Sequence, residues 1–500
     1  MISSIVWKSL AEDEKALAQF VQGILNRKGR RVFIDIDNYK LFVKEPMVEV
    51  GLWELLEKNV DAFDGLVKYK LDPNDVGINM AATVSAATDL LGVPETLADK
   101  VSALGLDIVR DLSDIKGSSA VRQRAIFDEY KGKLSKTALV HQVVAEGNFH
   151  LVLRDFSIAN RWACMYTGES DEDRALRREV LEWLDPNVPI YGWNDDEISF
   201  IRDISTYGDF AVPTDWSSNH SFFGQNIHTV KQNVRRAPIA PDKHYVAIVV
   251  SDGDNVQWLE REFFTTSTFG QRQRSALDYK MSWTFSPSLA ELCPDAAEKI
   301  YSGQKHDYFI SGVSGIGYAN CLSYPREHLD KFTELTARAM RDSDLNVVCL
   351  LDNIKLTENE ENVRDRLSCY AKYDNIYGGI WELDPDRYGS GKGKIFYAMG
   401  KPFVSVRFTM WHPSCKEECM TREWLDGIVN DINAMPVAPD REDGYTVLNV
   451  HPWTISMESL DYAVSKLAPH IELVYADELI NLIKENVKPN ENHSKNNRRS

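Results

Sequence analysis

Two aspartates separated by one glycine are the strongest candidates for chemistry in this chain. Asp252, Gly253 and Asp254 follow directly on the apolar run 244–250, and Asn255 comes next. Glycine permits a tight turn, and side chains two residues apart in an extended segment point to the same side. Carboxyl groups held close together have pKa values pushed apart, so that one is protonated and one ionised. Cleavage of a glycosidic bond requires that combination.

Two further carboxylates and two histidines stand at the ends of later apolar runs. Glu382 is the next candidate for a catalytic carboxylate, and Asp352 is a candidate substrate contact unless it caps a loop or forms an ion pair. His412 and His451 each precede a proline. A histidine at a strand end can orient a sugar hydroxyl or serve as acid or base, so both are predicted to contact substrate.

Aromatic and amide side chains near the same run ends predict a surface for a carbohydrate. Indole rings pack against the flat faces of sugars, and the ring N–H suits a polar rim. The alternative is that some of these rings cover the core, so we expect two or three of the five tryptophans to line a pocket. The predicted substrate-binding set comprises Asn255, Trp258, Trp283, Tyr318, Trp381, Trp411 and Trp453.

Other kinds of site remain open on the same residues. The oxygens of Asp252 and Asp254 could bind Mg²⁺ or Ca²⁺, and a metal-dependent carbohydrate deacetylase would combine an aspartate with two histidines. No His-x-x-x-His motif supports that alternative. A third possibility is a carbohydrate-binding protein without catalysis. No organic cofactor and no resident metal are expected.

The elements that must position these residues are eight β-like runs separated by segments long enough for helices. Alternation of strand and helix predicts a (β/α) barrel of seven or eight strands over residues 239–484. Chemistry in such barrels lies at the carboxyl ends of the strands. The eight runs are residues 244–250, 279–285, 308–315, 346–353, 376–383, 401–412, 445–453 and 471–478.

The N-terminal half predicts three small α/β domains, over 1–75, 76–148 and 149–238. Apolar residues recur at helical spacing over 12–26, and acids alternate with bases in a helix over 171–183. Strands are expected at 31–36, 65–70, 108–112, 138–140 and 188–193. The polar tail 485–500 is expected to be disordered.

Composition narrows the class of partner. The 500 residues carry a net charge of −18, which repels phosphate backbones, so nucleic acid is not expected as a partner. No run of about 18 apolar residues predicts a membrane span. Seven scattered cysteines and the lack of a leader indicate a reducing cytoplasm. Cys415 and Cys419 lack the second pair that a zinc site needs, and nothing indicates the oligomeric state.

The chain also resembles the GxGYxYP family of putative glycoside hydrolases, which is found mainly in bacteria. The resemblance covers nearly the whole chain and implies a multi-domain α/β fold and a hydrolase acting on a carbohydrate. The naming motif is interrupted here by residues 320–323. The segments that carry the resemblance are Gln22–Arg27, Asn79–Thr83, Leu153–Phe156, Ser251–Trp258, Gly315–Ala319 and Tyr324–Pro325.

Overall fold

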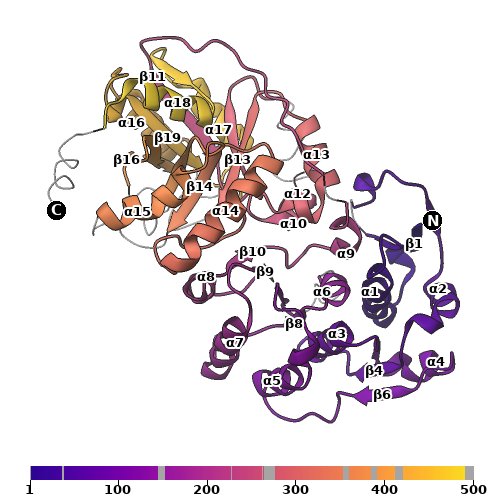
Figure 1. Ribbon diagram of the computed structural model, residues 1–500. Coiled ribbons are helices and arrows are strands. Elements are labelled where there is room, and N and C mark those ends of the chain that lie inside the picture. Colours follow the sequence, from indigo (N-terminus) through magenta and orange to yellow (C-terminus); the bar gives the residue numbers. More distant parts are fainter. Residues whose placement is uncertain are drawn as a thin grey trace.

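Two lobes build the molecule in the computed structural model (Figure 1). The N-terminal half forms one lobe, and a curled sheet with its helices forms the other. The structure describes residues 2–36, 39–144, 153–226, 228–261, 263, 276–352, 360–383, 391–411 and 421–489. The segment predicted to be a disordered tail begins inside the last helix, and residues 490–500 lie outside this description.

Two three-stranded parallel sheets open the N-terminal lobe, in the orders β2-β1-β3 and β5-β4-β6. The first contains β1 (Ile2–Val6), β2 (Val32–Asp35), β3 (Met47–Glu49), α1 (Glu12–Asn26) and α2 (Leu52–Lys58). The second contains β4 (Leu66–Tyr69), β5 (Leu91–Pro94), β6 (Ile108–Asp111), α3 (Gly77–Ala87), α4 (Ala98–Ser102) and α5 (Ser119–Tyr130). The helix predicted over 12–26 is confirmed.

A four-stranded parallel sheet of order β10-β9-β7-β8 follows. Its elements are β7 (Leu139–His141), α6 (Arg154–Asn160), β8 (Ala163–Met165), α7 (Asp171–Trp183), β9 (Pro189–Gly192), α8 (Glu197–Tyr207), β10 (Phe210–Val212) and α9 (His220–Phe223). Strand pairing crosses the domain boundaries expected after residues 75 and 148. β4 joins the sheet of β5 and β6, and β7 joins the sheet of β8, β9 and β10.

The C-terminal sheet curls into a half barrel, and each of the eight predicted runs contributes a strand. Its order is β16-β17-β15-β14-β13-β12-β11-β19-β18, with β20 paired to β11. The strands are β11 (His244–Val250), β12 (Met281–Phe285), β13 (Asp307–Val313), β14 (Val347–Asp352), β15 (Gly378–Leu383), β16 (Ile395–Ala398), β17 (Lys401–Ser405), β18 (Phe408–Met410), β19 (Tyr445–Val450) and β20 (Ile471–Leu473). The helices are α10 (Val256–Glu260), α12 (Leu289–Leu292), α13 (Pro294–Ser302), α14 (Arg326–Asp342), α15 (Glu360–Ala371), α16 (Arg422–Asn433), α17 (Met457–Ser465) and α18 (Ala476–Asn486).

The sixth run, 401–410, changes partner halfway along. Its first half, β17, pairs with β15, and its second half, β18, pairs with β19. The switch falls where Val406 N–H donates to Trp381 O and Arg407 N–H donates to Val447 O, both at 3.0 Å. The eighth run does not close the curl between β19 and β11. Because β19 occupies one edge of β11, β20 pairs with the opposite edge, at the start of β11 and ahead of β12.

Side chains alternate between the two faces of this curled sheet, as the pleat requires. Inner-face residues such as Val249, Ile380 and Val447 form one cluster with α18, whose Ile480 meets the start of β15. Outer-face residues such as Val250 and Trp381 join the main core with the surrounding helices. Because α18 fills the amino end of the curl, the carboxyl end is left for a site.

A buried carboxylate on the barrel side contacts two segments of the N-terminal lobe, one near its start and one near its end. Glu260 on α10 accepts hydrogen bonds from Tyr39 Oη at 2.8 Å and Ser217 Oγ at 2.9 Å. His220 Nε2 lies 2.7 Å from its other oxygen. Tyr39 Oη also accepts from Ser218 N–H at 3.0 Å. All of these side chains are buried, so each polar group depends on the others for hydrogen bonding.

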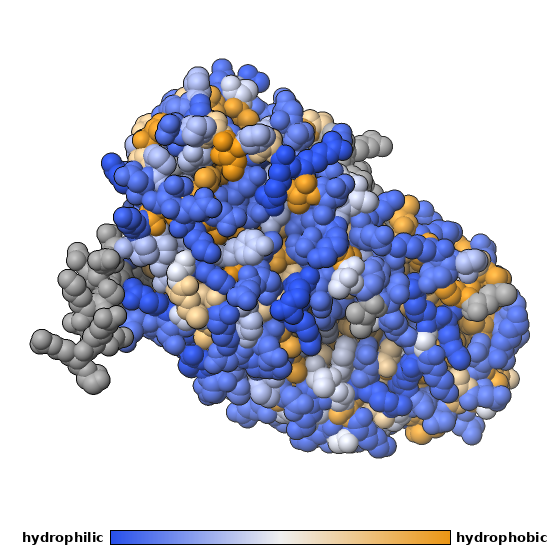
Figure 2. All heavy atoms as spheres, turned by 45° about the horizontal axis from the view of Figure 1, so that its top comes forward, coloured by the Kyte–Doolittle hydropathy of each residue, from blue (hydrophilic) through white to orange (hydrophobic). Residues whose placement is uncertain are grey.

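The surface is largely hydrophilic in the view of Figure 2, with small scattered apolar spots. This agrees with the excess of 75 acidic over 57 basic residues. Among the described residues, no helix has the length and apolar character needed to span a bilayer.

Replacing Tyr39 with phenylalanine should lower the free energy of unfolding by about 1–3 kcal/mol, because Glu260 loses a donor and Ser218 N–H loses its acceptor. Urea denaturation measures the change. Tyr462→Phe is the control, since its hydroxyl bonds Asp426 at the surface and its loss should change stability little. Equal effects of the two substitutions would show that the Glu260 cluster is not a structural junction.

Candidate active site

The Asp-Gly-Asp segment is a turn, not the extended segment expected from sequence. Asp252 has φ 66°, in the left-handed region, and Asn255 N–H donates to Asp252 O at 3.1 Å. Gly253 lies against β12, where its N–H donates to Thr284 Oγ1 at 2.8 Å. A Cβ on Gly253 would stand 1.7 Å from Thr284 O, so only glycine fits here. The turn nevertheless keeps Asp252 near enough to Asp254 for its charge to help raise the pKa of Asp254.

Asp252 is the most exposed of the three predicted catalytic carboxylates, with 19% of its side chain accessible. Its Oδ2 accepts from Ser251 Oγ at 2.6 Å, and its Oδ1 accepts from Trp453 Nε1 at 3.0 Å. His451 Nε2 lies 3.4 Å from Oδ2.

Asp254 and Glu382 are more deeply buried than Asp252. Burial, and then the charge of Asp252, raises the pKa of each to about 8. Glu382 lies on the inner face of β15, where Asn449 Nδ2 donates to its Oε1 at 2.9 Å and the Cys349 thiol is a second partner. Both carboxyl groups therefore carry a proton at neutral pH. The structure thus brings Asp252, Asp254 and Glu382 together.

His451 lies beside this group, at the end of β19. Its Nδ1 is 3.1 Å from Thr454 Oγ1, and its ring stacks on Trp411 with centroids 3.9 Å apart. This packing fixes the ring with Nε2 toward Asp252. His412 lies outside the described residues. Asn255 is partly exposed and accepts from Gln257 Nε2 at 3.3 Å.

Only part of the predicted tryptophan surface exists. Trp453 is 44% exposed and Trp411 is partly exposed, whereas Trp258, Trp283 and Trp381 are buried. The reason is the alternation of side chains along a strand. Glu382 points inward, so its neighbour Trp381 must point outward into the helix layer. Trp283 likewise belongs to the outer-face core, and Trp258 packs edge-on against Trp453 with centroids 5.2 Å apart.

Asp352 also faces outward, and its predicted contact with substrate is not supported. It is fully buried and accepts from Leu322 N–H at 3.2 Å, Trp381 Nε1 at 3.1 Å and Cys321 Sγ at 3.4 Å. Burial raises its pKa to about 7. These donors hold the loop after β13 on β14 and β15, so Asp352 has a structural role.

The interrupted family motif fastens the third N-terminal domain to the barrel. Tyr318 is buried, pairs with Ala211 through two backbone hydrogen bonds of 2.9 and 2.7 Å, and donates from Oη to Glu197 Oε1 at 3.0 Å. A Cβ on Gly317 would stand 2.7 Å from Ala211 O. Tyr324 Oη bonds Asn187 Oδ1 at 3.0 Å and also Gly208 O. The predicted substrate contact of Tyr318 is thus a contact between domains.

Three residues near the site were missed in the sequence. Glu197 adds its charge to those that raise the pKa of Asp254. Asp215 accepts from Gln257 Nε2 at 3.0 Å, and Trp193 stacks on Tyr318 with centroids 6.1 Å apart. Trp193 and Asp215 follow the ends of β9 and β10. The rule applied to the barrel, that function gathers at carboxyl ends of parallel strands, would have found them in the third domain.

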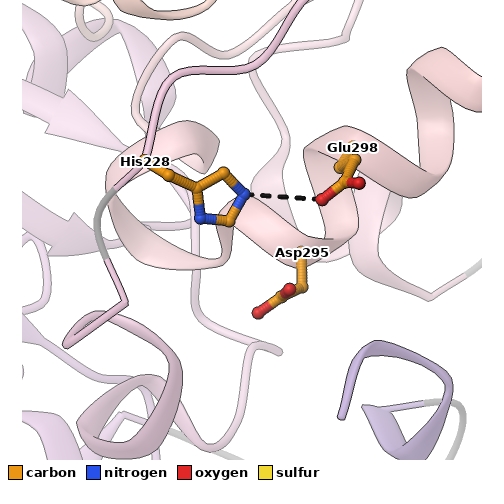
Figure 3. Close-up of side chains that lie close together, drawn as sticks. All are labelled: His228, Asp295 and Glu298. Carbon is orange, nitrogen blue, oxygen red and sulfur yellow. Dashed lines mark ion pairs between the residues drawn. The ribbon is translucent and has the colours of Figure 1, made fainter. Parts of the chain in front are cut away.

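One group of side chains in the described part of the chain has the spacing of metal ligands, and it lies elsewhere. His228, Asp295 and Glu298 approach one another beside α13 (Figure 3). Lys44 Nζ already contacts Asp295 Oδ1 at 3.0 Å and Glu298 Oε2 at 2.8 Å. The lysine ammonium therefore supplies the positive charge there, and the group links the first domain to the barrel.

Comparison with known proteins identifies the family. Residues 242–484 match the model described as "GxGYxYP putative glycoside hydrolase C-terminal domain", and residues 137–225 match "GxGYxYP third domain". The chain therefore belongs to the GxGYxYP family. No curated protein sequence matches it.

Two solved structures were compared with this one. A crystal structure described as a putative hydrolase from Bacteroides thetaiotaomicron is 24% identical, with a TM-score of 0.83, covering 98% of this chain and 95% of that chain. It establishes the same fold over the full length. A putative polysaccharide deacetylase from Mycobacterium smegmatis is 10% identical, with a TM-score of 0.32, covering 52% of this chain and 97% of that one.

Substitution of Gly253 by alanine should lower both stability and activity, because the new methyl group must displace β12 at Thr284 O. Thermal unfolding and any turnover assay measure the two effects. Gly427→Ala is the matched control: it lies in α16 with nothing within 4 Å of the added carbon. That change should raise helix stability by about 0.5–1 kcal/mol. Wild-type stability of the Gly253 variant would contradict the packing described.

Proposed function

We propose that this protein is a glycoside hydrolase whose site is the group of carboxyl side chains at the carboxyl ends of β11 and β15. The observation that carries the proposal is the contrast in burial and hydrogen bonding among three neighbouring acids. Asp252 is partly exposed and surrounded by donors, whereas burial and mutual charge raise the pKa of Asp254 and Glu382 to about 8. An ionised carboxylate beside a protonated one is what glycosidic cleavage uses.

Each carboxyl group takes the role that its surroundings favour. Asp252 is the ionised carboxylate on the anomeric side of the sugar. Asp254 is the general acid that protonates the leaving oxygen, because it is less deeply buried than Glu382. Glu382 is the second proton donor of the site, and Asn449 holds it in place. His451 orients a hydroxyl of the substrate, and the exposed face of Trp453 packs against a sugar ring.

The partner proposed is a carbohydrate, and no organic cofactor enters the mechanism. A screen of oligosaccharides and aryl glycosides should show hydrolysis by the wild type. Asp252→Asn, Asp254→Asn and Glu382→Gln should each lower kcat by about 10²–10⁴-fold, as loss of acid–base groups does.

Asp209→Asn is the control for this series. Asp209 is another buried carboxyl group whose pKa is raised to about 8 by burial, but it bonds Val188 N–H at 3.0 Å in the third domain. Its replacement should preserve turnover in the fraction that folds. Full activity of Asp254→Asn and Glu382→Gln would sink the proposed mechanism.

The pH profile should show a loss of kcat/KM as pH rises through about 8, because the acid then gives up its proton. Asp252→Asn removes a charge that raises the pKa of the acid, so that pKa should fall. The residual kcat/KM should then decline at a lower pH than in the wild type. Profiles of wild type and variant, measured on one aryl glycoside, provide the test. An unchanged alkaline limb in the variant would contradict coupling between these acids.

Two alternatives have distinct outcomes in the same experiments. A metal-dependent deacetylase would lose activity with a chelator, regain it with a divalent ion and release acetate instead of reducing sugar. A carbohydrate-binding protein without catalysis would bind glycans equally well as wild type and as Glu382→Gln, with no turnover by either.

A further inference from the structure

The carboxyl edge of the third-domain sheet faces the carboxyl edge of the barrel. Val256 N–H, at the start of α10, donates to Pro213 O just after β10 at 3.0 Å. Ala211 pairs with Tyr318 beyond β13. In Figure 1, α8, β9 and β10 lie directly against the barrel lobe. Ligands of parallel α/β sheets bind outside the carboxyl ends of the strands, and here two such edges meet.

The segment after β9 displays groups suited to a sugar. Trp193 is half-buried, with one side of its ring stacked on Tyr318, while Asp195 and Glu197 are exposed. Tyr318 Oη fixes Glu197, and Tyr166 Oη reaches Asp195 at 3.4 Å. The charge of Glu197 extends to Asp254 in the barrel, so this segment and the proposed catalytic group share one environment.

A second observation lies deeper along the same edge. Gln142, at the end of β7, is fully buried and donates from Nε2 to Asp215 O at 3.0 Å, yet its Oε1 has no hydrogen-bond partner among the described residues. Gln257 Oε1, from the barrel side, is equally unpaired there. Buried acceptors without donors are costly, and a ligand that brings hydroxyl or amino donors satisfies such groups.

Docking of the two domains accounts for only part of these features. It uses the backbone pairs, Tyr324 and the contacts of Tyr318 with Glu197 and with one face of Trp193, but it does not use Asp195. Exposed carboxylates contribute little to stability. The two exposed carboxylates near Trp193 repel an anionic ligand. They suit a ligand rich in hydrogen-bond donors.

We propose that the carboxyl edge of the third domain forms a sugar-binding subsite adjoining the barrel site, with Trp193 packing on the ring and Asp195 and Glu197 accepting hydrogen bonds. This subsite rests on the proposed glycoside hydrolase function and specifies its substrate. The substrate is an oligosaccharide that extends from the barrel across the third domain. The sugar residue held there is neutral or carries an amino group, and bears no carboxylate or sulfate.

Binding measured in a catalytically blocked background tests the subsite. Glu382→Gln, with and without Trp193→Ala, is titrated calorimetrically with neutral, amino and uronic-acid oligosaccharides of two to six residues. The single variant should bind longer neutral or amino oligosaccharides more tightly than the disaccharides. Addition of Trp193→Ala should weaken binding of the longer ligands about tenfold, as expected for the loss of one aromatic contact. Glu197→Gln should reduce the difference in affinity between neutral and uronic-acid oligosaccharides.

Trp183→Ala in the same background is the matched control. Trp183 is also a half-buried tryptophan of the third domain, packed on Phe127 with centroids 5.1 Å apart. Its loss should leave the affinities unchanged in protein that melts cooperatively. Equal affinities with and without Trp193, or tightest binding of uronic acids, would overturn the subsite while leaving the proposed hydrolase intact. Absence of glycan binding and of hydrolysis by the wild type would overturn both.

Discussion

Two carboxyl groups buried beside a third impose the main constraint on this structure. Removing an ionised carboxylate from water costs several kcal/mol, so burial raises the pKa of Asp254 and Glu382, and the nearby charge of Asp252 raises both further. That arrangement needs a dry cleft, a turn that brings two aspartates within reach of each other, and a strand that sends one acid inward. The close packing of Gly253 against β12 forms the turn, and the inner face of β15 directs Glu382 inward.

Cover over the barrel mouth comes from the N-terminal lobe, and most family motif residues serve this docking. Gln22 Nε2 donates to Asn219 Oδ1 at 2.6 Å, and Asn26 Nδ2 donates to Ser221 Oγ at 3.0 Å. These bonds hold the segment that carries Ser217 and His220 against Glu260. The motif residues Tyr318 and Tyr324 do the same from the barrel side. The motif that names the family therefore serves the assembly of its domains in this chain.

Much of the fold could be predicted from local patterns, and the exceptions have physical causes. All eight barrel runs form strands because long apolar stretches between helices have few other ways to be buried. Pairing was harder: β20 is too short and too polar to reveal its partner. The short strands β1, β3, β5, β8 and β10 were not predicted, because three to five residues carry little periodicity. Because these strands were not recognised, the predicted domain boundaries after residues 75 and 148 fell inside sheets.

At the site, the position of a residue at a strand end could be predicted from the sequence, but the direction of its side chain could not. Asp252, Asp254 and Glu382 stand at or just after the carboxyl ends of parallel strands at one edge, where the charge of Asp252 acts on the other two. Trp381 and Asp352 do not join them, since a pleated strand turns each successive side chain to the opposite face. Glu197 could not be placed from sequence, because only the docking of a separate domain carries it to Asp254.

The change of partner within residues 401–410 has a consequence for the wall of the curl. At the level of Glu382, the backbone ladder between β15 and the sixth run has already ended, while β18 follows β19 instead. The hydrogen bond from Asn449 to Glu382 spans this seam. A side-chain hydrogen bond thus takes the place that main-chain pairing has elsewhere in the curled sheet. This one hydrogen bond supports the sheet and also affects the pKa of Glu382. A substitution of Asn449 therefore alters both.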